Sequence, residues 1–259
     1  MIHTSFCTIA FQKNKWGKDR SVEMPLEEIL PVLGNAGYDA VEIWWPHLED
    51  ALTRSDATGL ADLLSAQGLH VSLVSPYFDF TSSDDSAEQS IELGGKVAEA
   101  AGSLGARGVR CFTGKVGSEE AAPAQWDRCV ESLQRLADSH DDLLWLLETH
   151  PRNLMDTIES TRTLLQRCDR KNIGIIYQPS TFAETYMQAL RELAPWIHHV
   201  HATNKSDNRG ALLGQGDMDW PAILDGLREI DFDGCVCIEW MGDDPAAVAA
   251  AEAEYLRGL

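Results

Sequence analysis

Short apolar runs recur along the whole chain, and segments with helical spacing separate them. The first helical segment shows the pattern clearly, because Leu26, Ile29, Leu30 and Leu33 occupy the i, i+3, i+4 and i+7 positions of one helix face. Several runs are apolar throughout, which is typical of parallel strands covered on both faces. Further segments with helical spacing are 60–64, 126–136 and 154–165. The predicted strands are residues 3–11, 40–45, 69–75, 108–112, 143–148, 173–178, 197–201 and 235–240.

Eight alternations of strand and helix predict an α/β fold, a single (β/α)8 TIM barrel that spans residues 1–259 as one domain. Gly34 and Gly37 lie where the first helix is expected to stop, and Pro221 lies where a late helix is expected to begin. An open, doubly wound sheet is the alternative, but no G-x-G-x-x-G motif follows the first predicted strand.

The composition narrows the classes of function. The 259 residues are 44% hydrophobic, and their formal net charge of -20 has no compensating lysine and arginine cluster. So acidic a chain repels phosphate backbones, and we expect no nucleic-acid partner. No apolar stretch reaches the roughly 18 residues of a membrane span, and the N-terminus lacks a signal-peptide pattern, so we expect a cytoplasmic protein with no membrane partner. The six cysteines form no CxxC pair and are expected to be reduced and buried.

Four consecutive predicted strands each end in a side chain that can bind a metal ion. These side chains are Glu148, Gln178, His201 and Glu239. The carboxyl ends of barrel strands surround one pocket, so we expect the four side chains to converge there. Two carboxylates, an imidazole and an amide oxygen suit Mn²⁺ best, with Mg²⁺, Co²⁺ or Zn²⁺ as alternatives.

The predicted chemistry is proton abstraction from the carbon next to a carbonyl. A divalent ion that polarises the carbonyl of a sugar would stabilise the enediolate that forms when the neighbouring carbon loses its proton. Glu148 and Glu239 are the predicted catalytic residues, because one carboxylate can act as the base and a second group can return the proton. The structural alternative for both carboxylates is a salt bridge that compensates their burial.

Several blocks of the sequence follow one family pattern. They include Leu-Glu-Thr-His-Pro at 147–151, His-Val-His at 199–201 and, as the most specific block, Gly-Gln-Gly-Asp-Met-Asp-Trp-Pro at 214–221. Through them the chain resembles the sugar phosphate isomerase/epimerase family with the xylose isomerase-like TIM barrel, in a superfamily that includes endonuclease IV. The resemblance covers nearly the whole chain and implies that the family's four metal ligands fall on Glu148, Gln178, His201 and Glu239.

The chain departs from that family pattern at three positions. The family usually has Asp where this chain has Gln178, and His where it has Thr181. The ketose 3-epimerase branch has a further Glu where this chain has Leu154. A neutral amide ligand is expected to weaken the affinity for a divalent ion, and the missing His removes an imidazole that would contact the substrate.

Four other side chains are candidates for substrate binding, each with a structural alternative. His150 lies on the same face as Glu148 and is expected to contact the substrate, unless it is a solvated loop residue. Trp45 either stacks on a sugar face or packs against the next helix. Lys205 and Arg209 either hold a phosphate or hydroxyl groups, or are surface charges of a loop.

Three polar side chains near these candidates have structural interpretations. Glu42 is expected to form a hydrogen bond within a layer of the barrel. His199 lies on the same strand face as His201 and competes with it for the role of functional imidazole. Asp219 is expected to cap the helix that follows it.

The leading functional hypothesis is a metal-dependent isomerase or epimerase that acts on a small sugar, sugar phosphate or cyclitol ketone. A dehydratase or lyase would use the same base and metal, so the sequence does not separate the two reactions. A barrel that has lost its metal and only binds a small ligand is the non-catalytic alternative. A nuclease would need histidine ligands after the third and fourth strands, where none occur. We expect a sugar-like small molecule as substrate, and relatives in the family often form homodimers.

Overall fold

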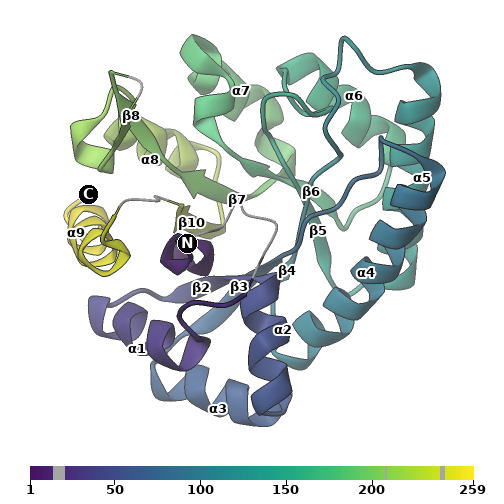
Figure 1. Ribbon diagram of the computed structural model, residues 1–259. Coiled ribbons are helices and arrows are strands. Elements are labelled where there is room, and N and C mark those ends of the chain that lie inside the picture. The colour runs from purple at the N-terminus through teal and green to yellow at the C-terminus, as the bar shows by residue number, and fades with distance from the viewer. Residues whose placement is uncertain (14–20, 208, 240–242) are drawn as a thin grey trace.

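Eight parallel strands form a closed barrel in the computed structural model (Figure 1). Around the barrel their order is β1-β10-β7-β6-β5-β4-β3-β2, so the last strand pairs with the first. The structure describes residues 1–13, 21–207, 209–239 and 243–259. The barrel strands are β1 (Ile2–Cys7), β2 (Ala40–Trp44), β3 (His70–Ser75), β4 (Gly108–Cys111), β5 (Leu144–Glu148), β6 (Ile173–Tyr177), β7 (Ile197–Ala202) and β10 (Gly234–Ile238). The prediction of a (β/α)8 TIM barrel is confirmed.

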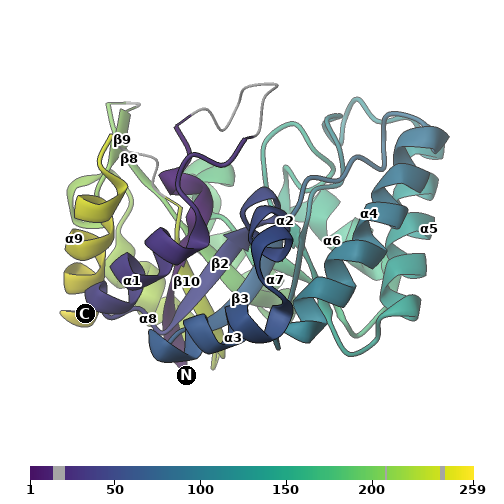
Figure 2. The ribbon, with the colours of Figure 1, turned by 60° about the horizontal axis from the view of Figure 1, so that its bottom comes forward.

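Helices surround the barrel, and Figure 2 shows the strands rising from the end at which the N-terminus lies. The apolar stripe predicted for the first helix is confirmed, because Leu26, Ile29, Leu30 and Leu33 are all buried. The α-helices are α1 (Leu26–Ala36), α2 (Trp45–Arg54), α3 (Ala57–Ala66), α4 (Asp84–Ser103), α5 (Pro123–Ser139), α6 (Ile158–Cys168), α7 (Tyr186–Leu193), α8 (Trp220–Glu229) and α9 (Pro245–Arg257).

Alternate residues of each strand face the helices and the barrel interior. On β5, Trp145 and Leu147 belong to the main apolar core shared with the helices. Leu146 instead packs inside the barrel with Leu73 and Ile176. Since side chains two residues apart share a face, Glu148 follows Leu146 on the inner face, at the carboxyl end of the strand.

The first strand is shorter than the predicted segment 3–11. β1 ends at Cys7, and the 3-10 helix η1 (Thr8–Phe11) follows. The Thr8 Oγ1 accepts a hydrogen bond from the backbone N–H of Trp44 at 2.9 Å and lies 2.9 Å from Nδ1 of His47. The Thr8 hydroxyl thus accepts the hydrogen bond that the backbone of a longer β1 would accept from β2. The chain leaves the barrel sheet at this point and enters η1.

Gly34 does not end the first helix as predicted. α1 continues to Ala36, and Gly37 ends it with a φ angle of 85°, in the left-handed region that glycine adopts without strain. Gly34 instead permits a close approach, because a Cβ atom there would lie 2.8 Å from the carbonyl oxygen of Gln67.

The helix predicted from the spacing at 154–165 begins later than that pattern indicates. α6 starts at Ile158, and the side chain of Thr157 caps it by accepting a hydrogen bond from the backbone N–H of Ser160 at 3.0 Å. Leu154 is buried in the main core from the loop before the helix. Leu154 is apolar because it is buried, and this apolar position matched the helical spacing although its backbone is not helical.

The loop after β7 contains an antiparallel hairpin that the hydrophobic pattern did not predict. Its strands are β8 (Asn204–Ser206) and β9 (Arg209–Ala211). Figure 2 shows the hairpin at the carboxyl end of the barrel. Both Lys205 and Arg209 belong to it, and both are exposed.

The cysteines and the helix lengths can be compared with what the composition predicted. All six cysteines are buried and free, as predicted. Among the helices of the described residues, none has the length and apolar character needed to cross a bilayer. Trp240, the end of the predicted strand 235–240, lies outside the described residues, and β10 ends at Ile238.

Candidate metal centre

Three of the four predicted metal ligands come together at the carboxyl ends of the strands. Glu148 ends β5, His201 lies near the end of β7, and Glu239 follows β10 directly. Their ligand atoms lie within 4.8 Å of one another. The Nδ1 of His201 is 3.7 Å from Oε2 of Glu148 and 3.5 Å from Oε2 of Glu239. This spacing leaves room for a cation between the imidazole and the two carboxylates.

Gln178, the fourth predicted ligand, follows β6 and lines the same cavity as Glu148 and Glu239. Its backbone N–H donates to Oγ1 of Thr149 at 2.9 Å, which holds this part of the chain in place. The side-chain Oε1 is buried and has no hydrogen-bond partner among the described residues. A buried carbonyl oxygen without a donor is costly, so this atom fits the role of a metal ligand.

Glu42 is more central to the site than the sequence indicated. Its side chain is fully buried on β2, and Oε2 lies 3.1 Å from Nε2 of His199 and 2.9 Å from Nε2 of His201. The other oxygen, Oε1, accepts hydrogen bonds from Oγ of Ser75 and from Sγ of Cys7. The predicted hydrogen bond within a barrel layer is confirmed, and it joins Glu42 to the candidate ligand His201.

The grouping of carboxylates around His201 shifts the protonation equilibria of the site. Burial alone would lower the pKa of His201, but the carboxylates of Glu42, Glu239 and Glu148 outweigh it and hold the pKa well above its usual value. Burial raises the pKa of Glu239 to about 7, with repulsion from Glu148 adding to the effect and attraction by His201 opposing it. The cluster therefore has a strong demand for positive charge.

The position of the ring nitrogen Nδ1 of His201 marks a place for that positive charge. Nδ1 is buried without a hydrogen-bond partner among the described residues, although two carboxylate oxygens face it within 4 Å. A lone pair in that position is repelled by both carboxylates unless a proton or a metal ion lies between them. Together with the unpaired Oε1 of Gln178, this donor set fits a divalent cation.

Arg110 is a second buried residue of the site that the sequence analysis missed. It lies on β4 with 2% of its side chain exposed, and its Nη1 is 3.2 Å from Oε2 of Glu148 and 4.0 Å from Oε1 of Glu239. The guanidinium carbon lies 4.8 Å from the ring centre of Tyr77 and 4.9 Å from that of Phe112. A single arginine within the apolar run 108–112 was the available signal, because a buried arginine needs a carboxylate partner.

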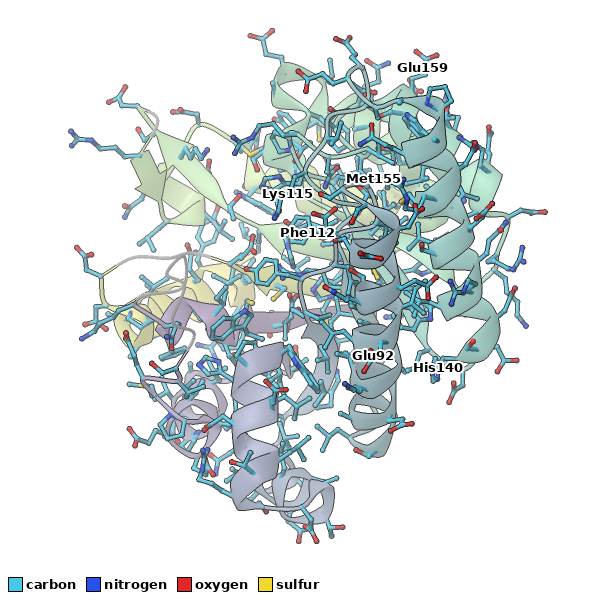
Figure 3. All side chains as sticks on the ribbon, turned by 45° about the vertical axis from the view of Figure 1, so that its right-hand side comes forward. Glu92, Phe112, Lys115, His140, Met155 and Glu159 are labelled. Carbon is cyan, nitrogen blue, oxygen red and sulfur yellow. The ribbon has the colours of Figure 1, made fainter. Side chains whose placement is uncertain are left out.

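The ligands open into a cavity of about 910 Å³ at the carboxyl end of the barrel. Arg110, Lys115 and Arg152 bring positive charge to its wall, and Asp79, Glu148 and Glu239 bring negative charge. Figure 3 shows Phe112 and Lys115 close together and His140, at the end of α5, far from them. The lining residues are Tyr77, Phe78, Asp79, Arg110, Phe112, Gly114, Lys115, Glu148, His150, Pro151, Arg152, Gln178 and Glu239.

Only one of the four side chains predicted to bind substrate lines this cavity. His150 does so, with its Nδ1 2.7 Å from the carbonyl oxygen of Pro151 and its ring edge-on to Phe112. Trp45 begins α2 and packs against the main core, which agrees with the structural alternative for this residue. Lys205 and Arg209 lie in the exposed β8–β9 hairpin and are not among the residues that line the cavity.

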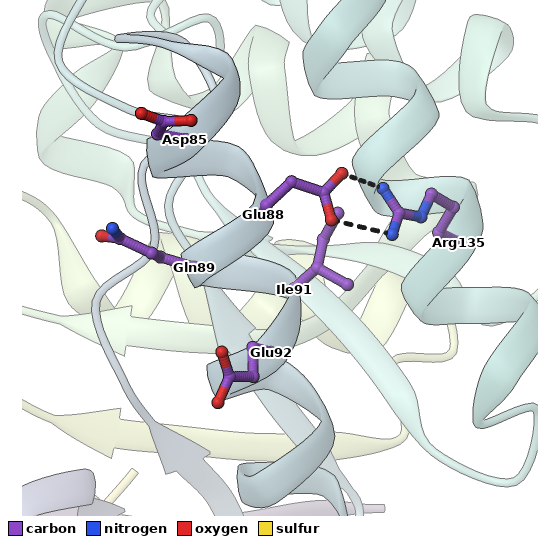
Figure 4. Close-up of a pocket in the computed structure, with 6 residues that line it drawn as sticks. All are labelled: Asp85, Glu88, Gln89, Ile91, Glu92 and Arg135. Carbon is purple, nitrogen blue, oxygen red and sulfur yellow. Dashed lines mark hydrogen bonds and ion pairs between the residues drawn. The ribbon is translucent and has the colours of Figure 1, made fainter.

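A shallower depression on the outer surface has a different character. It measures about 470 Å³ and lies between α4 and α5 (Figure 4). Glu88 and Arg135 form an ion pair across it, so these opposite charges already satisfy each other. It shares no lining residue with the cavity at the strand ends, and it contributes no residue to the candidate metal centre. Its lining residues are Asp85, Glu88, Gln89, Ile91, Glu92 and Arg135.

Comparison with known proteins agrees with the fold. The model of the xylose isomerase-like TIM barrel family matches residues 32–259, and the chain belongs to this family. A 3-dehydroshikimate dehydratase from Bacillus anthracis is 25% identical to it over an alignment that covers 97% of this chain and 95% of the relative. A putative hydroxypyruvate isomerase from Mus musculus is also 25% identical, over 84% of this chain and 85% of the relative.

The solved structures include one of similar size and fold. The crystal structure of the probable 3-DHS dehydratase AsbF from Bacillus anthracis matches with a TM-score of 0.86 and 23% identity. The match covers 98% of each chain. At this identity the likeness concerns the fold, which is a xylose isomerase-like barrel.

Proposed function

We propose that this protein is a divalent-metal-dependent lyase that removes water from a small, hydroxylated and anionic ketone. The observation that carries the proposal is Nδ1 of His201, which has no hydrogen-bond partner among the described residues, faces two carboxylate oxygens, and lies beside a cavity whose wall includes Arg110, Lys115 and Arg152. The first feature favours a bound divalent cation, and the second favours an anionic substrate. The 3-dehydroshikimate dehydratase that aligns over nearly the whole chain supports this class of reaction.

In this proposal Glu148, His201 and Glu239 hold the ion, and Oε1 of Gln178 contributes a neutral ligand. Mn²⁺ is the proposed ion, because the set combines oxygen donors with one imidazole. When bound, the ion polarises the substrate carbonyl and stabilises the negative charge that develops on its oxygen. Gln178 and the neighbouring Arg110 both reduce the negative charge of the site, so we expect a weaker affinity than a site with three carboxylates would have.

His150 is the proposed proton-transfer group. Its Nδ1–H donates to the carbonyl oxygen of Pro151, which leaves the lone pair on Nε2 of a ring that lines the cavity. The imidazole would remove the proton next to the carbonyl, the C–H bonding pair would become the carbon–carbon π bond of an enolate, and the carbonyl π pair would move onto the oxygen. The carbonyl then re-forms, the enolate π pair shifts to make the new carbon–carbon double bond, and the C–O bond of the β-hydroxyl breaks. The proton on His150 converts the departing hydroxide into water.

Three cationic side chains would orient the anionic group of the substrate. Arg110 has a buried Nε without a hydrogen-bond partner among the described residues, and it lies in the wall of the cavity. Lys115 and Arg152 lie in the same wall. The rings of Tyr77 and Phe112 stack at 5.7 Å beside Arg110 and exclude water from it, which strengthens its attraction for an anion.

An isomerase or epimerase is the second candidate, as the sequence analysis predicted. The putative hydroxypyruvate isomerase from Mus musculus favours it. Both reactions begin with removal of the same proton. The lyase then loses a hydroxyl group as water, whereas the isomerase or epimerase returns a proton to carbon. In deuterated water an isomerase or epimerase returns solvent deuterium to carbon, whereas the lyase releases a product that lacks one water. Mass spectrometry of the product separates the two.

The metal is tested by elemental analysis of protein purified without chelator. We expect about one equivalent of divalent metal in the wild type, and its loss in Glu148→Gln and His201→Ala, because each change removes a ligand. Glu252→Gln is the matched control, since Glu252 is a buried carboxylate that is not among the residues lining the cavity, and this variant should retain the metal. A wild type that contains no metal and gains no thermal stability from added Mn²⁺ would favour the non-catalytic ligand-binding barrel.

The substrate class is tested with 3-dehydroshikimate and hydroxypyruvate as probes in the presence of Mn²⁺. We expect a product of 3-dehydroshikimate that has lost one water, and no turnover after the metal is removed. His150→Gln should lower kcat by about 10²–10⁴-fold and leave the metal content unchanged, because it removes only the proton-transfer group. Conversion of hydroxypyruvate with deuterium incorporation, and no loss of water from 3-dehydroshikimate, would replace the lyase with the isomerase.

A further inference from the structure

The carboxylate of Glu42 is surrounded by hydrogen-bond donors. Its Oε2 lies within hydrogen-bond distance of Nε2 of His199 and of His201. Its Oε1 accepts hydrogen bonds from Oγ of Ser75 and Sγ of Cys7. All five side chains are at most 2% exposed. An ionised carboxylate has no proton to donate, so every one of these contacts requires the proton to be on the partner.

This arrangement determines which nitrogen of His201 carries a proton. If Nε2–H of His201 donates to Glu42, the ring nitrogen that remains for a metal ion is Nδ1. That atom is buried without a hydrogen-bond partner among the described residues and faces the carboxylates of Glu148 and Glu239. The bond to Glu42 also fixes the rotation of the ring, because the Nε2 to Oε2 distance is 2.9 Å.

We infer that Glu42 is a positioning residue that selects Nδ1 of His201 as the metal-binding nitrogen and holds the ring in that orientation. The inference rests on the proposed metal-dependent function for the presence of the ion. A carboxylate behind a metal-binding imidazole increases the basicity of the nitrogen that faces the metal. Glu42 thus acts on the ion through His201, without touching the ion or the substrate.

A competing arrangement would place a metal ion among Glu42, His199 and His201 themselves. Their ligand atoms also lie within 4.8 Å of one another. In that arrangement His201 would bind through Nε2, and the proton would move to Nδ1. The contacts favour the first arrangement, because the Nε2 atoms already have a partner in Glu42 while Nδ1 of His201 has none.

The first arm of the test measures affinity. Co²⁺ is titrated into metal-free wild type, Glu42→Gln and the control Glu252→Gln, which removes a buried carboxylate outside the cavity. We expect the dissociation constant to rise about 10–100-fold in Glu42→Gln and to stay within about twofold in the control. Equal affinity of Glu42→Gln and wild type would overturn the inference.

The second arm identifies the nitrogens, and it needs only the wild type. In Zn²⁺-loaded protein with ¹⁵N-labelled histidine, NMR should show the metal on Nδ1 of His201 and a slowly exchanging proton on Nε2. Metal on Nε2 would overturn the inference, even if Glu42→Gln does not fold. If the wild type binds no ion, the proposed function fails by itself, and the metal-free spectrum then decides whether Glu42 holds protons on both Nε2 atoms.

Discussion

Two groups of side chains inside the barrel follow opposite rules. The apolar cluster, Leu73, Leu146 and Ile176, needs only close packing, and its members touch one another without any specific geometry. The charged cluster, Glu42, Arg110, Glu148, His201 and Glu239, needs a partner for each polar atom. Within this cluster Nδ1 of His201 has no hydrogen-bond partner among the described residues and faces two carboxylates, so it marks the candidate site for a cation. The contrast teaches that packing alone fixes the apolar cluster, whereas the charged cluster leaves a position open for a ligand.

The two clusters also differ in how they affect stability. Burial of a Leu or Ile side chain contributes about 1.5–3 kcal/mol to folding. Burial of charges carries a desolvation cost that attraction between them offsets only when the geometry is good. A change in the apolar cluster should therefore affect stability alone, whereas a change in the charged cluster should affect stability and metal affinity together.

The largest expected effect is that of Arg110→Met in the charged cluster. The change leaves Glu148 and Glu239 without their buried cation, which should lower the free energy of unfolding of the metal-free protein by about 3–5 kcal/mol. Added Mn²⁺ should recover part of the loss, because it supplies positive charge at the same carboxylates. Urea unfolding with chelator and with Mn²⁺ measures both effects, and a variant as stable as wild type in chelator would contradict the comparison.

A somewhat smaller effect is expected for Leu146→Ala in the apolar cluster. The change leaves a cavity beside Leu73 and Ile176, with a loss of about 3 kcal/mol in the free energy of unfolding. Mn²⁺ should not restore this loss beyond what it adds to wild type, because no charge is removed. The same urea titrations provide the measurement. A specific rescue by the ion would mean that the two clusters are coupled.

Glu252 sharpens the comparison, because it is a buried carboxylate outside both clusters. It lies in α9, accepts a hydrogen bond from the backbone N–H of Leu213 at 2.8 Å, and burial raises its pKa to about 7. Between pH 4.5 and 7 the folded protein therefore binds this proton more tightly than the unfolded chain, and stability falls as pH rises through that window. We expect Glu252→Gln to be more stable than wild type at pH 8, by about 2 kcal/mol.

The pH dependence of thermal unfolding checks this expectation. The advantage of Glu252→Gln over wild type should shrink as pH falls toward 4.5, where the carboxyl group is protonated in both states. The amide retains an oxygen for the N–H of Leu213, so the local structure should persist. A pH-independent difference between the two proteins would contradict the assigned cause.

The smallest expected effect is that of Asp219→Ala, at an exposed carboxylate. The Asp219 side chain caps α8 by accepting a hydrogen bond from the backbone N–H of Ala222 at 3.0 Å, as predicted from the sequence. Its removal should cost about 1 kcal/mol of stability. Metal content should be unchanged. A loss of metal in this variant would show that destabilising α8 also disturbs the charged cluster.

The sequence predicted the position of a side chain correctly where one strand alone carried the signal. Each of Glu148, His201 and Glu239 ends an apolar run, and strand ends of a barrel face one pocket whatever the loops do. The same reasoning left Lys205 and Arg209 undecided between substrate contact and surface charge, because the hairpin that carries them depends on hydrogen bonds between two short, polar strands. It left Trp45 undecided between pocket and core, since an aromatic side chain suits either surroundings.

Local pattern alone therefore determined the barrel, the order of its strands in the chain and the polar residues at their ends. Periodicity reports which side of a strand or helix is buried, and this information is present in any short segment. Only the tertiary structure decided that Glu42 bonds to His201 across 159 positions of sequence, and that Arg110 pairs with Glu148. Such pairings depend on how the strands close into a barrel. Two charged side chains pair when they are close in space, and their separation along the chain does not reveal that distance.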